Sequence, residues 1–318
     1  MGEAMDRAIP DAQRGHWVDH SAPSWMRPYL RLARIDRPIG WWLLVLPCWW
    51  SAALVASSQS RALPSISDLI LFLIGAVAMR GAGSTYNDIV DRDLDQLVAR
   101  TRTRPVASGQ ISVKSASLFC AVQCFVGLLV LLSFNGFAIG LGFLSIIPVF
   151  VYPFMKRFTS WPQAVLGLAF SWGALMGWAT AEGSLAAPAF WLYGAAIAWT
   201  MGYDTIYAVQ DVEDDAIAGI RSTARFFGSR TPLAVGIFYG IACLMTFAAV
   251  LSAGAGWVAY AGVALFSIHL FRQTVRIRLD DGALALKLFQ SNRDAGLVLF
   301  VGLALDAAVR HVLPRLMG

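Results

Sequence analysis

Acidic side chains gather in two short windows of this chain. Nine of its twenty Asp and Glu residues lie there, although only 14% of the 318 residues are charged. The first window, residues 87–95, reads NDIVDRDLD, and the second, residues 203–215, reads YDTIYAVQDVEDD. Carboxylates concentrated in a chain so poor in charge indicate a site that binds cations.

The spacing within each window places oxygen ligands along one face of a helix. The recurring positions are Asn87, Asp91 and Asp95 in the first window and Asp204, Asp211 and Asp215 in the second. Like charges four residues apart repel each other, so a helix gains no stability from this pattern. Hard oxygen ligands select Mg²⁺, which usually completes its shell with water and substrate phosphates. The windows therefore predict a Mg²⁺ site that holds a diphosphate. A solvated acidic helix end would explain one window, but not two.

Basic side chains accompany the acidic windows. They are Arg34 and Arg37 near the start of the chain, Arg100 and Arg104 after the first window, and Lys156 and Arg157 between the windows. Guanidinium and ammonium groups bind phosphate oxygens, which suits a diphosphate site. The alternative is that these charges only fix the topology of a membrane protein. For Arg100 and Arg104 the residues alone leave both interpretations open.

One arginine, Arg80, lies inside an apolar segment in the sequence MRGAG. It precedes Asn87 by two helical turns, which places it on the same helix face and about 10 Å deeper. An arginine within a membrane is costly and marks a functional site by default. It requires an anionic partner, which is either Asp91, Asp204 or the carboxylate of a substrate.

Long apolar segments separate these charged stretches. Because 57% of the residues are hydrophobic, the composition excludes disorder and argues against a water-soluble protein. About 20 apolar residues cross a bilayer, and nine segments qualify: 38–57, 68–87, 113–134, 137–155, 163–181, 187–204, 232–253, 257–271 and 295–313. We expect an all-α polytopic membrane protein with nine transmembrane helices, because lipid offers the backbone no other hydrogen-bonding partners.

Lys and Arg collect in the loops on one side of these nine segments. The positive-inside rule then places the N-terminus in the cytoplasm and the C-terminus outside. Both acidic windows begin at cytoplasmic ends of even-numbered segments, so we expect them on one membrane face. The net charge of +5 follows from this topology, and no nucleic-acid partner is expected.

The first residues indicate a mobile tail rather than a targeting signal. We expect residues 1–26 to form this tail and residues 27–318 to form one transmembrane domain. The tail has no apolar signal-peptide core, and its acidic residues, such as Glu3 and Asp6, are untypical of a transit peptide. These features favour the inner (cytoplasmic) membrane of a bacterium over the mitochondrial inner membrane.

The motifs of this chain resemble those of the UbiA-type intramembrane prenyltransferases, in particular the branch that acts on 4-hydroxybenzoate. The resemblance covers about residues 27–305. It rests on NDxxDxxxD at 87–95, RTxxRPxxSG at 100–109 and YDTxYAxxDxxDDxxxGxxSTA at 203–224. RIDRPIG at 34–40, YPFMKR at 152–157 and GLAFSWG at 167–173 support it. One departure is Val212-Glu213, where family members often carry Arg-Asp.

The resemblance implies nine helices around a central cavity and transfer of a polyprenyl group to 4-hydroxybenzoate in ubiquinone biosynthesis. It implies that Mg²⁺ and the diphosphate are held by Asn87, Asp91, Asp95, Asp211 and Asp215. It implies that Arg80 holds the benzoate carboxylate. The remaining candidates for substrate contact are Arg37, Asn87, Arg100, Arg104, Lys156, Arg157, Asp204 and Tyr207.

We expect ionisation of the allylic C–O bond, attack by the ring carbon ortho to the phenol, and loss of a proton. Asp91 and Asp211 are both candidates to accept the phenolic proton, and Asp88 is a further catalytic candidate.

The expected partners are polyprenyl diphosphate, 4-hydroxybenzoate and the bilayer. The same chemistry on naphthoate, homogentisate or haem is the main alternative. A cation transporter is disfavoured, because its carboxylates would lie near the membrane midplane.

Overall fold

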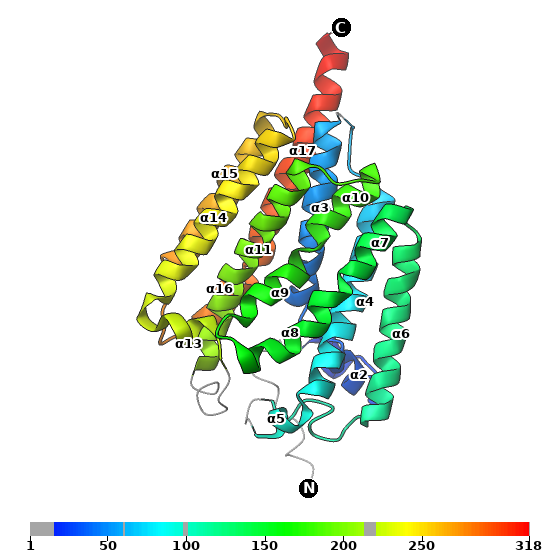
Figure 1. Cartoon of the computed structure of the whole chain (residues 1–318), viewed down its shortest axis with the longest axis vertical. Helices are drawn as coiled ribbons and strands as arrows, with labels where there is room; N and C mark the ends of the chain where they lie inside the picture. Colours follow the sequence, from blue (N-terminus) through cyan, green and yellow to red (C-terminus); the bar gives the residue numbers. More distant parts are fainter. Residues whose placement is uncertain (1–15, 60, 98–100, 213–220, 318) are drawn as a thin grey trace. The chain divides into compact units, whose positions relative to one another are not determined.

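The computed structural model is all-helical and describes residues 16–59, 61–97, 101–212 and 221–317 (Figure 1). Its α-helices are α1 (Trp17–His20), α2 (Arg27–Leu32), α3 (Ile39–Ser58), α4 (Ile66–Val90), α5 (Arg92–Leu97), α6 (Val113–Leu132), α7 (Gly136–Leu144), α8 (Ile146–Phe158), α9 (Pro162–Ser171), α10 (Gly173–Glu182), α11 (Ala187–Ala208), α13 (Thr223–Phe227), α14 (Thr231–Ser252), α15 (Trp257–Thr274), α16 (Gly282–Gln290) and α17 (Asn292–Met317). Two 3₁₀ helices, η1 (Val209–Asp211) and η2 (Gly228–Arg230), flank α13 in the sequence.

The chain is a multi-pass membrane protein. Among the described residues, seven helical stretches are long and apolar enough to cross a bilayer: Ile39–Ser58, Ile66–Val90, Val113–Leu132, Gly136–Met155, Pro162–Glu182, Thr223–Ser252 and Gly282–Val312. The predicted segments 187–204 and 257–271 are helices too, namely α11 and α15, but they are not among the seven. Polar residues dilute their apolar character, including Asp204 in α11 and Arg272 in α15.

Two of the predicted segments are interrupted. Segment 137–155 is divided at Ser145 between α7 and α8, because Pro148 has no N–H to donate to the carbonyl of Leu144. Segment 163–181 is divided at Trp172 between α9 and α10. There Gly173 approaches α3 so closely that a Cβ at this position would lie 2.5 Å from Cys48 Sγ. Each pair still forms one candidate membrane span, Gly136–Met155 and Pro162–Glu182, as predicted, and the apolar pattern did not indicate the local break within it.

The chain forms two compact units. The first unit comprises Met1–Trp41 and Ile74–Val130. Its core contains Leu32 and Val106 with Ile111 and Ala116, against which Tyr29, Ile89, Val113 and Phe119 pack. Helices α4 and α6 approach closely at two glycines, since a Cβ at Gly81 would overlap the side chain of Gln123 and one at Gly127 would overlap that of Met79.

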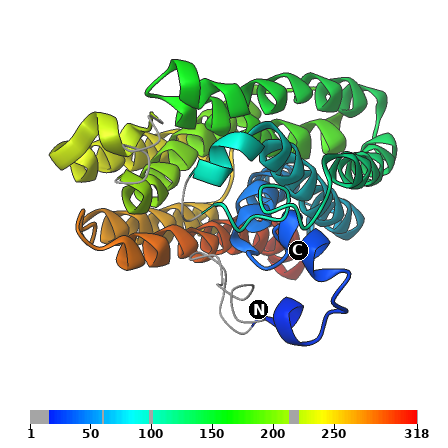
Figure 2. The same ribbon diagram turned by 90° about the horizontal axis from the view of Figure 1, so that it is seen from below.

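The second unit comprises Trp42–Leu73 and Leu131–Gly318, and α11 is central to its packing. Helix α11 contacts α9, α10, α14 and α16, while α15 lies along both α14 and α17 (Figure 1). Figure 2 shows α13 and the start of α14 beside α11 at one end of this unit. Helices α15 and α17 meet at Gly262 and Gly302, because a side chain on either glycine would press on the backbone of the other.

Candidate active site

The first acidic window spans the junction of α4 and α5 in the first unit. Asp91 occupies the turn between the two helices. The helical hydrogen bonds nevertheless continue, since Asp91 N–H donates to Asn87 O at 2.9 Å and Asp95 N–H donates to Asp91 O at 2.8 Å. Residues four apart in this window, namely Asn87, Asp91 and Asp95, therefore still lie on one face of the helical backbone through the turn. Asp88, Asp91 and Asp95 are buried, whereas Asn87 is half-buried.

Asp88 lies between two arginines. Its Oδ1 accepts a hydrogen bond from Arg34 Nη2 at 2.8 Å and one from Arg104 Nη1 at 3.3 Å. Asp88 is 0% exposed, and its Oδ2 has no hydrogen-bond partner among the described residues. A carboxylate buried in this way requires nearby positive charge, because desolvation of an unpaired charge is costly.

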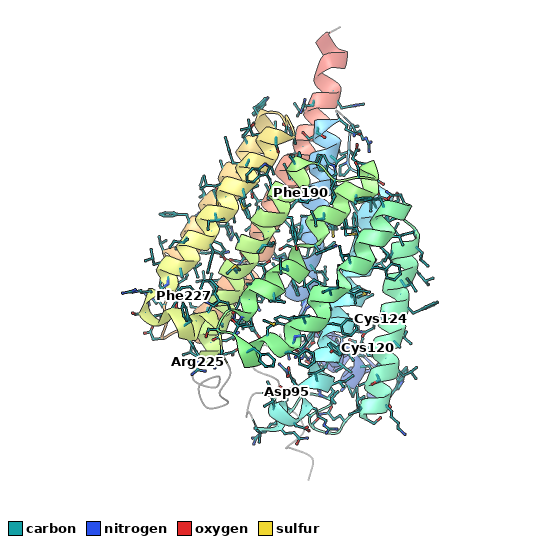
Figure 3. The ribbon with its side chains drawn as sticks, in the orientation of Figure 1. Asp95, Cys120, Cys124, Phe190, Arg225 and Phe227 are labelled. Atoms are coloured by element: carbon teal, nitrogen blue, oxygen red, sulfur yellow. The ribbon has the colours of Figure 1, made fainter. Side chains whose placement is uncertain are left out.

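Arg104 joins this pair to the end of the first window. Its Nη1 donates to both Asp95 oxygens, at 3.2 and 3.0 Å. The loop is tied to α5 a second time, because Thr101 Oγ1 donates to Asp95 O at 3.0 Å. Asp95 lies on α5 in Figure 3. Burial raises the pKa of the Asp95 carboxyl; Arg104 opposes this effect, and the carboxylates of Asp88 and Asp91 add to it.

Arg34 is a component of this cluster that the sequence pattern marked only as a basic residue. It has φ +58°, the left-handed region that side chains disfavour, and it is 6% exposed. Burial lowers the pKa of Arg34 to about 10; Asp88 opposes the shift, while Arg104, Arg37 and Arg80 lower it further. Strain at a buried, charged position is typical of functional sites. The only feature of the sequence that could have marked Arg34 as a site residue is the mixture of acidic and basic residues in RIDRPIG.

Arg80 is half-buried on α4, within the apolar part of that helix. Its Nη1 donates to Ser84 Oγ at 2.7 Å, one turn further along the same helix. Arg37 forms an ion pair with the adjacent Asp36 at 3.4 Å. In the first unit, four arginines therefore lie close enough to interact through their charges with three buried aspartates. The arginines are Arg34, Arg37, Arg80 and Arg104, and the aspartates are Asp88, Asp91 and Asp95. Such a mixture can bind an anionic ligand and a cation together.

The second acidic window does not continue as one α-helix. Asp204 and Tyr207 lie on α11, which ends at Ala208, and Asp211 ends the 3₁₀ helix η1. The helix type therefore changes within the window, since a 3₁₀ helix has three residues per turn rather than 3.6, and the shared face of Asp204 and Asp211 stays a prediction. Asp211 is buried, and Asp204 and Tyr207 are half-buried.

Packing and neutral hydrogen bonds hold this end of α11. The ring of Phe289 lies 4.7 Å from that of Tyr207 and 5.8 Å from that of Tyr203. The hydroxyls of Thr205 and Thr223 are 2.7 Å apart. A Cβ at Gly202 would overlap the ring of Tyr239, so α11 and α14 are in close contact there. Several separate elements thus fix the backbone that carries Asp204 and Asp211.

Some residues of the predicted motifs lie wholly or partly outside the described part of the structure. Arg100 and Asp215 lie outside the described residues, as does Glu213. Lys156 and Arg157 belong to helix α8, but their side chains are outside the described part of the structure. Their roles stay predictions.

The donor set of the first window fits a Mg²⁺ ion. Among the described residues, no three His, Cys, Asp or Glu side chains form a metal cage by themselves. Mg²⁺ is usually held by one or two carboxylates, with phosphate oxygens and water completing the shell. The fully buried Asp91 and the buried Asp95 supply hard oxygen atoms of the required kind. The buried Asp88 Oδ2, which has no hydrogen-bond partner among the described residues, is a further oxygen that the predicted ligand set did not include.

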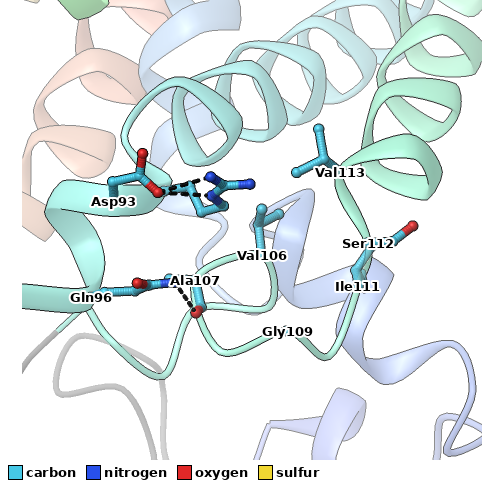
Figure 4. A pocket seen from close by; sticks show the side chains of 9 residues that line it. Asp93, Gln96, Val106, Ala107, Gly109, Ile111, Ser112 and Val113 are labelled. Atoms are coloured by element: carbon cyan, nitrogen blue, oxygen red, sulfur yellow. Dashed lines mark hydrogen bonds and ion pairs between the residues drawn. The ribbon is translucent and has the colours of Figure 1, made fainter.

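A surface pocket of about 370 Å³ lies in the first unit between α5 and the loop that follows it (Figure 4). Its lining residues are Arg92, Asp93, Gln96, Val106, Ala107, Gly109, Ile111, Ser112 and Val113. Gln96 Nε2 donates to Ala107 O at 3.1 Å across one wall, which ties α5 to the loop that follows it. None of the predicted site residues lines this pocket, so it is separate from the carboxylate cluster.

Comparison with known proteins decides the family. Residues 44–301 match the UbiA prenyltransferase family. The chain belongs to this family. A relative from Rattus norvegicus, named 4-hydroxybenzoate polyprenyltransferase, mitochondrial, is 43% identical over 95% of this chain and 83% of its own length. Relatives of the same name from Arabidopsis thaliana and Aedes aegypti are 44% and 46% identical over 91% and 87% of this chain. The match spans 71% and 63% of those two proteins.

Solved structures support the fold. The apo structure of a UbiA homolog from Aeropyrum pernix K1 matches with a TM-score of 0.69 and 25% identity, over 83% of this chain and 97% of that one. A UbiA homolog from Archaeoglobus fulgidus, solved bound to GPP and Mg²⁺, matches with a TM-score of 0.63 and 21% identity, over 88% and 99%. The prediction of a UbiA-type helical membrane protein is thereby confirmed.

Proposed function

We propose that this UbiA-family protein transfers a polyprenyl group from polyprenyl diphosphate to the 3-position of 4-hydroxybenzoate, a step of ubiquinone biosynthesis. The observation that carries the proposal is 43–46% identity over roughly nine-tenths of the chain to proteins named for this activity. The buried carboxylate and arginine cluster of the first unit supplies chemistry that suits a diphosphate substrate.

We propose that Mg²⁺ is the cofactor and that both acidic windows provide its ligands. Asn87, Asp91 and Asp95 supply oxygen atoms in the first window, and Asp211 and Asp215 supply them in the second. The ion, when bound, would stabilise negative charge on the departing diphosphate. The GPP and Mg²⁺ bound to the Archaeoglobus fulgidus homolog support this assignment, as does the mixture of acids and arginines around Asp88.

The residues of this chain would act on the two substrates as follows. Arg37, Arg100, Arg104, Lys156 and Arg157 bind phosphate oxygens and neutralise the charge of the leaving group. Arg80, deeper on α4, holds the carboxylate of 4-hydroxybenzoate.

Cleavage of the allylic C–O bond releases diphosphate and yields an allylic cation. The ring carbon ortho to the phenol forms the new C–C bond with this cation, and loss of the ring proton restores aromaticity. Asp91 or Asp211, with Asp88 as a further candidate, accepts the phenolic proton as the ring attacks and returns it to the phenolate oxygen of the product, while the ring proton leaves to water. In this scheme Asp204 and Tyr207 contact the bound substrate.

We also propose that α11 and α15 cross the membrane, which gives nine spans, a cytoplasmic N-terminus and a central substrate cavity. Both helices have the length for a span, with 22 and 18 residues. Hydropathy underestimates α11 because its polar residues are largely covered by protein rather than lipid. The relatives are named as mitochondrial, and placement in a bacterial cytoplasmic membrane stays a prediction.

A donor and acceptor panel tests the function. Membranes that contain the protein are incubated with polyprenyl diphosphate, Mg²⁺ and radiolabelled 4-hydroxybenzoate, naphthoate or homogentisate, with EDTA and membranes lacking the protein as controls. We expect an organic-soluble labelled product from 4-hydroxybenzoate that EDTA abolishes. Absence of that product would contradict the proposal, and a faster reaction with another acceptor would reassign the substrate within the family.

A further inference from the structure

The guanidinium of Arg80 is held by two small residues that the proposed mechanism does not use. Ser84 Oγ accepts from Arg80 Nη1 at 2.7 Å, and Ser84 is only 4% exposed. Gly40, at the start of α3, lies against the other side of the group: a Cβ there would overlap Arg80 Nε and lie 3.1 Å from both Cζ and Nη2. All three residues belong to the first unit.

The glycine at position 40 is required by this contact rather than by its backbone. Gly40 is absent from the described glycines with positive φ, so its backbone conformation suits any residue. The atoms that a side chain would meet are the far end of a long, flexible arginine rather than backbone. A larger residue at position 40 is therefore expected to displace Arg80 and to leave the helices in place.

Helix α4 is fixed independently of these contacts. On another face of the helix, a Cβ at Gly81 would overlap Gln123 Nε2, and Thr85 Oγ1 lies 3.2 Å from Gln123 Oε1. Thr85 and Gln123 are both buried, so α6 sets the rotation of α4. Changes at Gly40 or Ser84 should therefore alter the direction of the Arg80 side chain without moving its backbone.

We propose that Gly40 and Ser84 are positioning residues that orient the Arg80 guanidinium, and that this orientation gives the enzyme its preference for an aromatic acceptor that carries a carboxylate. The inference rests on the proposed role of Arg80 in binding that carboxylate. A guanidinium binds a carboxylate best through two parallel hydrogen bonds in one plane, so its direction matters. A side chain already confined by Gly40 and Ser84 loses less conformational entropy when the acceptor binds.

The test compares an acid with its neutral analogue. For each variant, preference is the inhibition constant of the neutral 4-hydroxybenzamide divided by the Michaelis constant for the acid, 4-hydroxybenzoate. We expect Gly40→Ala and Ser84→Ala to lower this ratio about 10-fold, since each weakens a charge-assisted contact. The Michaelis constant for the prenyl diphosphate should be unchanged. Ser84→Thr, which retains the hydroxyl, should keep the wild-type ratio.

Two controls separate the possible failures. Ser51→Ala removes another fully buried helical serine, whose Oγ has no hydrogen-bond partner among the described residues, and should leave the ratio unchanged. Arg80→Ala should lower the ratio more than either neighbour does. If only Arg80→Ala lowers it, the positioning role is overturned and the role of Arg80 stands. If Arg80→Ala leaves it unchanged, both fail. If Gly40→Ala does not fold, Ser84→Ala and Ser84→Thr decide the question alone.

Discussion

The described residues around the two acidic windows make different kinds of contact. In the first unit, Asp88 and Asp95 are bound by the guanidinium groups of Arg34 and Arg104, all of them largely buried. In the second unit, the end of α11 contacts aromatic rings and makes neutral hydrogen bonds, such as that between the Thr205 and Thr223 hydroxyls at 2.7 Å. Further back along α11, Trp199 Nε1 donates to Asn292 Oδ1 at 2.9 Å. Among the described contacts, buried ion pairs surround the first window, whereas aromatic rings and neutral hydrogen bonds surround the described part of the second.

This difference has an energetic consequence. A buried ion pair contributes little net stability, but removal of one partner leaves an uncompensated charge and is strongly destabilising. When one residue of a network of uncharged hydrogen bonds is removed, the free energy of unfolding falls only by the contribution of the lost hydrogen bonds and packing contacts. The two windows should therefore respond differently to mutation of their supporting residues.

The largest effect is expected for Arg34→Ala. Asp88 would keep its buried charge and lose its closest cation, so the free energy of unfolding should fall by about 3–5 kcal/mol. Thermal unfolding in detergent micelles measures this change. The double variant Arg34→Met/Asp88→Leu removes both charges and should recover most of the loss. A small effect of Arg34→Ala would show that the first unit does not depend on this pair.

Asp91→Asn and Asp211→Asn test whether both windows take part in the chemistry despite their different support. Each substitution preserves shape and removes one carboxylate charge. We expect kcat to fall by about 100- to 1,000-fold in both, because charge stabilisation at the leaving group has this magnitude. Initial rates in the membrane assay provide the measurement. A large loss in only one variant would restrict the essential acids to one window.

Asn292→Ala probes the neutral network of the second unit. Asn292 is 0% exposed, and besides Trp199 it contacts Tyr239 and Gln273, at 3.2 Å each. We expect a loss of about 1–3 kcal/mol, since buried donors lose their acceptor. Unfolding under the conditions used for Arg34→Ala provides the comparison. A cost equal to that of Arg34→Ala would remove the distinction between the two windows.

Arg31→Ala should have the smallest effect and serves as the reference for an ion pair at the surface. Arg31 bonds Asp19 at 2.8 Å, with side chains that are 27% and 31% exposed. An ion pair that is partly open to solvent in this way is screened and contributes about 0–1 kcal/mol, so the Tm should shift little. A shift as large as that of Arg34→Ala would mean that burial is not what distinguishes these arginines.

Much of the fold followed from hydropathy alone. Predicted segments such as 68–87 and 113–134 correspond closely to α4 (Ile66–Val90) and α6 (Val113–Leu132). The breaks at Ser145 and Trp172 were missed, because hydropathy does not register a lost backbone donor or a close approach of two helices. The transition from α11 to η1 at Val209 was missed as well, since residue spacing assumes one helix type throughout.

The candidate site was predictable in its residue types but not in its internal pairing. The windows identified Asp91 and Asp95, and RTxxRPxxSG identified Arg104. Nothing in the local pattern indicated that Arg34, 54 residues before Asp88, would bond to it at 2.8 Å with positive φ. Such long-range contacts depend on how α2, α4 and the loop after α5 pack. The support that Gly40 gives to Arg80 depends on the same packing.

Mg²⁺-dependent binding of a prenyl thiodiphosphate, a poorly reactive donor analogue, tests the central claim most directly. The measurement titrates Mg²⁺ against the analogue in wild type, Asp91→Asn and Asp211→Asn, with Arg31→Ala as control. We predict tight binding that requires Mg²⁺ in the wild type and control, and at least about a 10-fold loss in both Asp variants. Unchanged Mg²⁺-dependent affinity in either Asp variant would contradict the claim that both windows supply ligands.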